Sequence, residues 1–401
     1  MQQGPTEVFR PSAPLVFLMA AACGLTAANI YYAQPLIGLI APALGIDPSR
    51  ASWMVTLTQL GYASGLLLLV PLGDMLENRR LLVATVAASV PALLAAGLAH
   101  SSAVFLMAGI FIGLTSVSVQ MLLPLAAHLT SDHTRGRVVG NIMSGLLLGI
   151  LLARPVASLI ADAYGWRAVF VLSSALMAGL ACVLWRFLPH RQPEATHHYG
   201  DLLKSLGRLP VAYPILLRLA IYQAAAFACI SLFWTAVPLF LMHEYGFHQR
   251  GIAGFALIGA GGALFAPIAG RLADRGVGRG GSLAAMLAIV MAFLLAGWGG
   301  LVSHSVWLLA VAGVLLDAGV QFNLVFSQRT IYALAPALRS RLNGVFIAIF
   351  FVGGAFGSVL VSPLLASIGW AGICAVGIIL PLSALTYLLT ERPGMRSGGV
   401  S

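Results

Sequence analysis

The sequence predicts an all-α integral membrane protein with twelve transmembrane helices, arranged as two six-helix pseudo-repeats. The composition, the number of long apolar stretches and a set of repeated motifs lead to this fold class. Of the 401 residues, 60% are hydrophobic and only 8% are charged, and the mean hydropathy is +0.95. A soluble domain carries about 25% charged residues. Most of the surface of this chain must therefore face lipid.

Twelve segments are apolar and long enough to cross a membrane, because a helix of about 20 residues spans the hydrocarbon core. The predicted spans are residues 15–40, 51–73, 80–99, 103–128, 139–161, 167–187, 213–241, 251–271, 282–301, 305–333, 342–366 and 371–390. They divide the chain into an N-terminal bundle (1–187), a polar linker (188–212) and a C-terminal bundle (213–401).

The basic residues predict the orientation of the chain. The net charge is +10, but these residues are scattered, and a contiguous basic face that would bind nucleic acid is absent from the sequence. If the N-terminus is cytoplasmic, sixteen basic residues fall in cytoplasmic segments, against three (Arg50, Arg167 and Arg250) outside. Such a bias places both termini and the linker in the cytoplasm.

The two halves share motifs at a constant offset of 204 residues. Arg135-Gly136-Arg137 corresponds to Arg339-Ser340-Arg341, Gly149 to Gly353, and Gly165-Trp166 to Gly369-Trp370. Two parallel repeats of six spans place a substrate site near the midplane between the halves, which rock to alternate access.

Asp317 is a carboxylate near the middle of a predicted span, where an ionisable group usually lines a water-filled path or pairs with another charge. Arg154, in the fifth span, differs from it in depth by roughly 7 Å, which an arginine side chain can bridge. Burial favours the protonated acid and a nearby arginine favours the charged one. We predict that Asp317 and Arg154 couple transport to protons. A static buried salt bridge, and an arginine that binds an anionic substrate group, are the alternatives.

Charged residues at the cytoplasmic ends of the second and eighth spans are candidates for a gate. Asp74 precedes Arg79 by five residues, as Asp274 precedes Arg279. A carboxylate at a helix end can hold an arginine of a neighbouring span. We expect a cytoplasmic gate made of Asp74, Arg79, Arg80, Asp274, Arg275 and Arg279, with simple positive-inside topology as the alternative.

These duplicated loops, VPLGDMLENRR (70–80) and GRLADRGVGR (270–279), together with YYAQPL (31–36) and LLDAGVQ (315–321), carry a resemblance. The chain resembles the major facilitator superfamily, most closely its bacterial twelve-span branch of drug and metabolite efflux. The resemblance implies drug:proton antiport in the bacterial inner membrane and a cavity lined by spans one, four, seven and ten. Two departures weaken the antiport inference: Gly109 stands where such antiporters often carry an arginine, and Arg154 stands where glycine is usual.

Amides and aromatic side chains on those four spans suit a small amphipathic molecule. The candidate substrate-binding residues are Asn29, Tyr32, Gln34, Gln120, Tyr222, Gln223, Phe227, Trp234, Gln321 and Asn323. Each of them alone is about as well explained by hydrogen bonding between helices.

The predicted function is secondary active transport, with proton-coupled export of a small organic molecule as the leading form. Proton-coupled uptake or facilitated diffusion is the alternative. An enzyme is disfavoured, because the sequence has neither a metal-ligand cluster nor a Ser/His/Asp arrangement at a common depth. We expect a monomer that uses the proton gradient, contacts lipid, and needs no metal or other cofactor.

Overall fold

The computed structural model describes residues 12–193, 198–274, 278–335 and 338–391, and every regular element in these ranges is a helix. The first half contains α1 (Ala13–Ala28), η1 (Gln34–Leu36), α2 (Ile37–Ala43), η2 (Pro48–Arg50), α3 (Trp53–Leu68), η3 (Val70–Asp74), α4 (Asn78–Gly97), α5 (Ser102–Thr115), α6 (Ser118–His128), α7 (Asp132–Tyr164) and α8 (Trp166–Phe187). The linker contains α9 (Tyr199–Ala212). The second half contains α10 (Pro214–Tyr245), α11 (Gln249–Gly259), η4 (Ala260–Phe265), α12 (Ala266–Asp274), α13 (Gly278–Gly297), η5 (Trp298–Val302), α14 (Val306–Leu334), α15 (Arg339–Val359), α16 (Val361–Ser367) and α17 (Trp370–Leu389).

The helices confirm the predicted fold class. Ten helical stretches among the described residues are long and apolar enough to cross a membrane. Two further spans are broken: α1, η1 and α2 make up the first, and α11, η4 and α12 make up the eighth. Counting each broken helix once gives the twelve predicted spans. The break in the first span covers residues 29–33, just before η1, where Pro35 supplies no backbone N–H to continue the α-helix.

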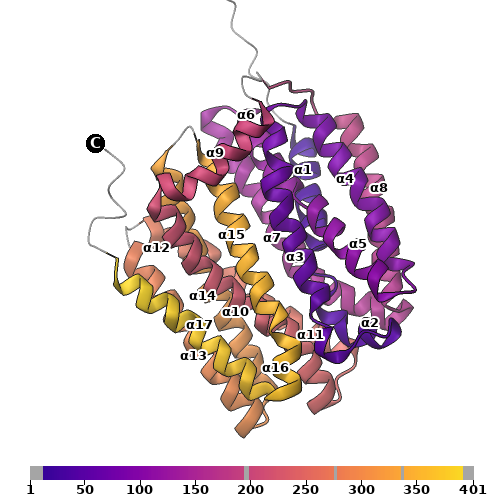
Figure 1. The fold of residues 1–401 in the computed structure, drawn as a ribbon. Coiled ribbons are helices and arrows are strands. Elements are labelled where there is room, and N and C mark those ends of the chain that lie inside the picture. Colours follow the sequence, from indigo (N-terminus) through magenta and orange to yellow (C-terminus); the bar gives the residue numbers. More distant parts are fainter. Residues whose placement is uncertain (1–11, 194–197, 275–277, 336–337, 392–401) are drawn as a thin grey trace, which may run out of the picture.

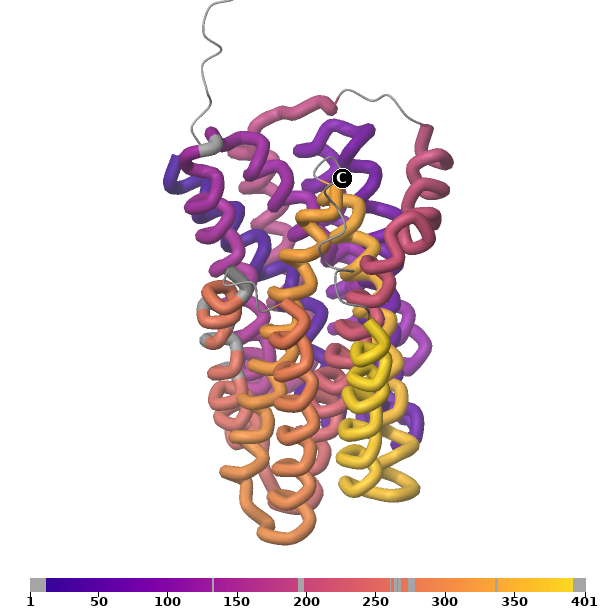
Figure 2. The backbone as a smooth tube through the Cα atoms, turned by 90° about the vertical axis from the view of Figure 1, so that its left-hand side faces the viewer, coloured from indigo at the N-terminus to yellow at the C-terminus, as the bar shows by residue number. Residues whose placement is uncertain are grey.

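The two halves lie side by side, with α1–α8 (indigo to magenta) opposite α10–α17 (red to yellow) (Figure 1). Figure 2 shows the helices of the second half running lengthwise along the bundle. We call the end of the bundle that carries α9 the α9 end, and the opposite end, where α2 and α16 lie, the far end. Helix α9 buries Leu202, Leu206 and Leu209 and packs on α3 and η3 of the first half and on α10 and α15 of the second. The linker thus contacts both halves, while the division at residues 187 and 213 into separate units stays a prediction.

The repeated glycines serve the same structural purpose in both halves, either at a close helix contact or at a turn. Gly149 of α7 packs directly on Gly24 of α1, and Gly353 of α15 packs on Ala224 of α10, where an added Cβ would lie 2.5 Å from the carbonyl oxygen. Small residues of this kind let membrane helices approach closely. Gly165 and Gly369 have positive φ angles of 80° and 73°, which glycine adopts without strain. Each one turns the chain into the following helix.

Candidate functional site

A cavity of about 260 Å³ lies between the two halves. Helices α1, α3, α6 and α7 and the segment around η1 line it from the first half, and α10, α14 and α15 line it from the second. It extends from Arg154 and Asp317 toward the α9 end, where Gln328 and Tyr332 of α14 line it. The four spans that the resemblance implied are all present, and the second, fifth and eleventh spans also line the cavity.

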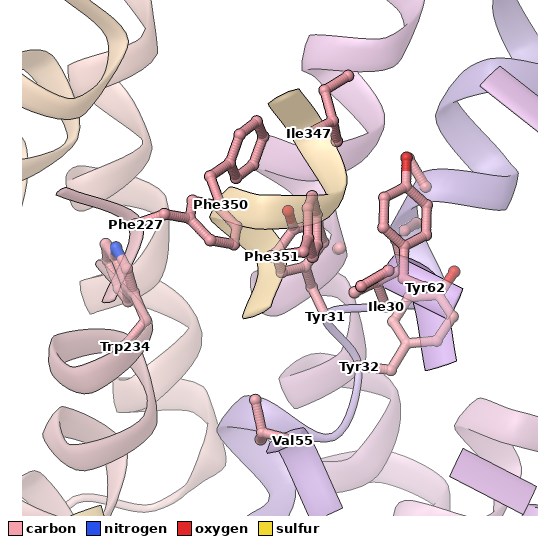
Figure 3. Close-up of a cluster of buried hydrophobic side chains, with 14 of the residues drawn as sticks. Ile30, Tyr31, Tyr32, Val55, Tyr62, Phe227, Trp234, Ile347, Phe350 and Phe351 are labelled. Atoms are coloured by element: carbon pink, nitrogen blue, oxygen red, sulfur yellow. The ribbon is translucent and has the colours of Figure 1, made fainter. Parts of the chain in front are cut away.

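Aromatic rings form much of the wall. Phe227 of α10 lies 4.9 Å from Phe350 and 4.7 Å from Phe351 of α15, measured between ring centroids. Tyr62 of α3 lies 4.3 Å from Phe351, so rings from both halves meet (Figure 3). Because this wall offers few hydrogen bonds, it suits the apolar body of a ligand.

Arg154 lies in this cavity with a fixed orientation. Its Nε donates a hydrogen bond of 2.8 Å to Oε1 of Gln34. Its guanidinium carbon lies 5.0 Å from the ring centroid of Tyr31 and 4.8 Å from that of Trp234, within the range of cation–π attraction. The side chain is only 9% exposed. The arginine is therefore held by an amide and two rings.

Asp317 is also buried beside Trp234, and it is 8% exposed. The indole Nε1 of Trp234 donates a hydrogen bond of 2.8 Å to Oδ1 of Asp317. Gly259 packs against the ring of Trp234 and Gly262 packs against Cβ of Asp317, so glycines of the broken eighth span make room for both side chains. None of the described ion pairs within 4.0 Å joins Asp317 to Arg154. Trp234 contacts both charged groups and connects them.

The candidate substrate-binding residues divide into two groups. Gln34, Gln120, Gln223, Phe227 and Gln321 line the cavity, and Trp234 contacts both charges beside it. The other four are engaged in side-chain contacts within their own half. Ser173 donates to Asn29 (2.7 Å), Asn323 donates to Gln223 (2.7 Å), Tyr222 donates to Glu391 (3.4 Å), and Tyr32 lies buried beside Ser173.

The gate candidates do not form one cluster. Asp74 accepts hydrogen bonds from Nε (3.3 Å) and Nη2 (3.2 Å) of Arg341, which joins η3 of the first half to α15 of the second. Arg79 instead contacts the ring of Trp185 in its own half and His190 at the start of the linker. Arg80 lies 3.8 Å from Glu77, and Arg279 donates to the carbonyl of Leu389. The side chain of Asp274 and all of Arg275 lie outside the described part of the chain.

Glu77 fixes the backbone at the start of α4, which carries Arg79 and Arg80. Its carboxylate caps α4 by accepting from the backbone N–H groups of Arg79 and Arg80, both at 2.9 Å. Partial burial disfavours the charge of Glu77. The N–H groups of Arg80, Arg79 and Arg191 outweigh this effect and hold its pKa below the usual range.

Polar contacts also join the halves at the far end. Thr56 of α3 and Ser358 of α15 share a hydrogen bond of 2.9 Å, and Ser362 accepts one of 2.9 Å from the backbone N–H of Ser52. Arg250 donates to Asp162 at 2.6 Å, which joins α11 to α7. The cavity thus ends at a layer of contacts between the halves.

Two residues that the sequence reasoning left out of the site belong to it. Arg341 is the hydrogen-bond partner of Asp74, and its position in the repeated Arg-x-Arg motif is the sequence feature that points to it. Asn343 donates to Gln120 of the first half (3.3 Å) and accepts from Gln328 (3.2 Å), which links three cavity-lining side chains. A search of the described residues for three or more His, Cys, Asp or Glu side chains that could hold a metal ion finds none.

Twelve spans around a central cavity are an arrangement typical of membrane transporters. Among solved structures, the nucleoside transporter NupG has a TM-score of 0.76 at 13% identity, with 93% of this chain and 99% of that one covered. The family model for the Major Facilitator Superfamily matches residues 16–291 and 219–399. The chain belongs to that superfamily.

Relatives are found in bacteria. The uncharacterized transporter YgaY of Escherichia coli O157:H7 is 41% identical over 373 residues, which cover 92% of this chain and 94% of the relative. A chloramphenicol resistance protein of Pseudomonas aeruginosa is 27% identical over 351 residues, 84% of this chain and 81% of the relative. These matches identify a transporter of the superfamily without defining its branch.

Proposed function

We propose that this protein is a proton-coupled secondary active transporter that exports a small amphipathic organic molecule by alternating access. The observation that carries the proposal is the placement of Arg154 and Asp317 in one cavity between the halves, with Trp234 in contact with both. A buried carboxyl group that contacts the same indole ring as a buried guanidinium can change that arrangement when it takes up a proton. The similarity to a chloramphenicol resistance protein supports export as the direction.

The proposed setting is the bacterial inner membrane, with the α9 end in the cytoplasm, as the distribution of the arginines indicates. In that orientation the cavity extends toward the cytoplasm, and the contacts of Ser52, Thr56 and Asp162 close the outer side. A monomer surrounded by lipid is sufficient for this mechanism, with the proton gradient as its energy source.

Proton-coupled uptake or facilitated diffusion is the second candidate. One observation favours it: Gly109, where related antiporters often carry an arginine, packs against α3 so closely that an added Cβ would lie 3.1 Å from Oγ1 of Thr58. The site thus has no room for that arginine.

Flux into everted membrane vesicles with an imposed pH gradient tests both candidates. Chloramphenicol, nucleosides, sugars and organic acids serve as probes, and vesicles that lack the protein serve as the control. Accumulation that depends on an acidic lumen supports export, whereas accumulation only in right-side-out vesicles under an inward proton gradient supports uptake. If every transported probe crosses the membrane at the same rate with and without the gradient, proton coupling is refuted.

A further inference from the structure

The cavity contains a guanidinium group with unused hydrogen-bonding capacity. An arginine side chain has five N–H donors. The described hydrogen bond of Arg154 uses one of them, from Nε to Gln34. Among the described residues, neither Nη group of Arg154 has a hydrogen-bond partner, and the side chain lines the cavity. The two Nη groups are therefore available to a ligand.

The neighbours of Arg154 prepare it for a planar, two-oxygen partner. Gln34 fixes Nε, and the rings of Tyr31 and Trp234 lie at 5.0 and 4.8 Å from the guanidinium carbon. A guanidinium whose plane is fixed loses little entropy when it binds a carboxylate through two parallel hydrogen bonds. The protein's own carboxylate in this cavity, Asp317, does not pair with Arg154 in this way, because it accepts a hydrogen bond from Trp234.

Aromatic and aliphatic side chains make up most of the remaining wall of the cavity, beside the amides of Gln120, Gln223, Gln321, Gln328 and Asn343. Phe227, Phe350 and Phe351 line it together with Ile150 and Leu146. Apart from Arg154, Asp317 is the charged side chain among the lining residues, and its carboxylate opposes the entry of an anion. A ligand that matches Arg154 and the aromatic rings has one negative group and an apolar body.

We propose that the cavity binds a small amphipathic organic anion, whose carboxylate pairs with the two Nη groups of Arg154 and whose apolar body packs on the Phe227, Phe350 and Phe351 rings. This inference deepens the proposed transport function by naming its substrate class. It assigns Arg154 to the binding of substrate, Trp234 to the separation of the two charges, and Asp317 to opposing the anion.

Binding to the purified full chain, measured by titration calorimetry in lipid nanodiscs, tests the inference without any flux. The probes share one skeleton and differ in charge: phenylacetate is an anion, phenylacetamide is neutral and phenethylamine is a cation. We expect phenylacetate to bind the native protein at least about tenfold more tightly than phenylacetamide, because charge-assisted bidentate hydrogen bonds are the strong ones. Phenethylamine should bind most weakly.

Four variants distinguish the roles of Arg154 and Asp317 in binding. Arg154→Gln should reduce the affinity for phenylacetate to that for phenylacetamide, and Arg154→Lys should retain part of the preference because it keeps the charge without the planar fork. Asp317→Asn should tighten phenylacetate, because it removes the opposing charge. Ser144→Ala, at an exposed residue outside the cavity lining, is the matched control and should bind like the native protein. Gel filtration and thermal melting show that each variant is folded.

Tightest binding by phenethylamine, an unchanged preference for phenylacetate in Arg154→Gln, or no binding of any probe at millimolar concentration would overturn the inference. The two proposals fail separately. Phenylacetate binding through Arg154 without any proton-driven flux would leave the anion site and refute the transport mechanism. Proton-driven flux of a neutral drug, without any preference for phenylacetate over phenylacetamide in the binding assay, would leave the transport mechanism and refute the anion site.

Discussion

Replacement of Asp74 by Asn should favour opening at the α9 end. The carboxylate of Asp74 accepts from Nε and Nη2 of Arg341 at 3.3 and 3.2 Å, which connects η3 to α15 across the two halves. The side chains of Arg341 and Asp74 are 27% and 49% exposed, so water screens the pair. Such exposed pairs contribute about 0.2–1 kcal/mol. Since 1.4 kcal/mol corresponds to a factor of ten in an equilibrium constant, the ratio of open to closed molecules should rise by a factor of about 1.4–5.

Distances between two spin labels measure this shift. One label at His133→Cys on α7 and one at Ala333→Cys on α14 report the separation of the halves at the α9 end, because both positions are exposed. A Cys182→Ala background removes the exposed native cysteine, and the other three cysteines are buried. High salt should move the native protein in the same direction as Asp74→Asn, and it should have less effect on the variant.

Arg79→Gln is the matched control, because the described side-chain contacts of Arg79 are with Trp185 of the first half and His190 of the linker, and neither reaches the second half. It should leave the distance distribution unchanged. Equal distributions in the native protein and Asp74→Asn would refute the role of the Asp74–Arg341 pair. A shift in Arg79→Gln larger than that in Asp74→Asn would assign the gate to Arg79 instead.

Three further predictions concern stability and coupling. Glu77→Gln should lower the free energy of unfolding by about 1 kcal/mol at neutral pH, because Glu77 caps α4. The pKa of Glu77 is lowered in the folded protein, so this stabilisation is present above the unfolded pKa and is lost as pH falls through the folded pKa. Thermal melting should therefore show the native protein and the variant converging in acid. Gly149→Ala should destabilise the protein by about 1–3 kcal/mol through overpacking against Gly24, whereas Gly179→Ala, where an added Cβ meets nothing within 4 Å, should melt like the native protein. Trp234→Phe keeps a ring beside Arg154 but removes the donor to Asp317, so proton-driven flux should fall while the protein stays folded; unchanged flux would show that the connection is not needed.

The sequence predicts the fold well because each span needs a length and an apolar composition that are visible locally. The repeat is predictable for a similar reason. Gly149 and Gly353 occur where helices touch, and Gly165 and Gly369 occur where φ is positive, so the sequence itself carries both constraints.

The details of the site depend on helix rotation, which the sequence does not carry. Asn29 and Gln34 lie in the same span, yet Asn29 contacts Ser173 in its own half, while Gln34 contacts Arg154 in the cavity. The sequence placed Arg154 and Asp317 at compatible depths, but it could not show that the indole of Trp234 connects them. Arg341 was visible in the repeat, but its pairing with Asp74 depends on how the halves meet.

The most direct test of the account is flux through Asp317→Asn in proteoliposomes, measured with and without an imposed pH gradient and with any substrate that the native protein transports. The amide keeps the size of the side chain and an oxygen that can accept from Trp234, but it cannot exchange a proton. The account predicts that substrate still crosses the membrane while its flux no longer responds to the gradient. A variant that responds to the gradient as fully as the native protein would contradict the assignment of Asp317 as the proton-coupling residue.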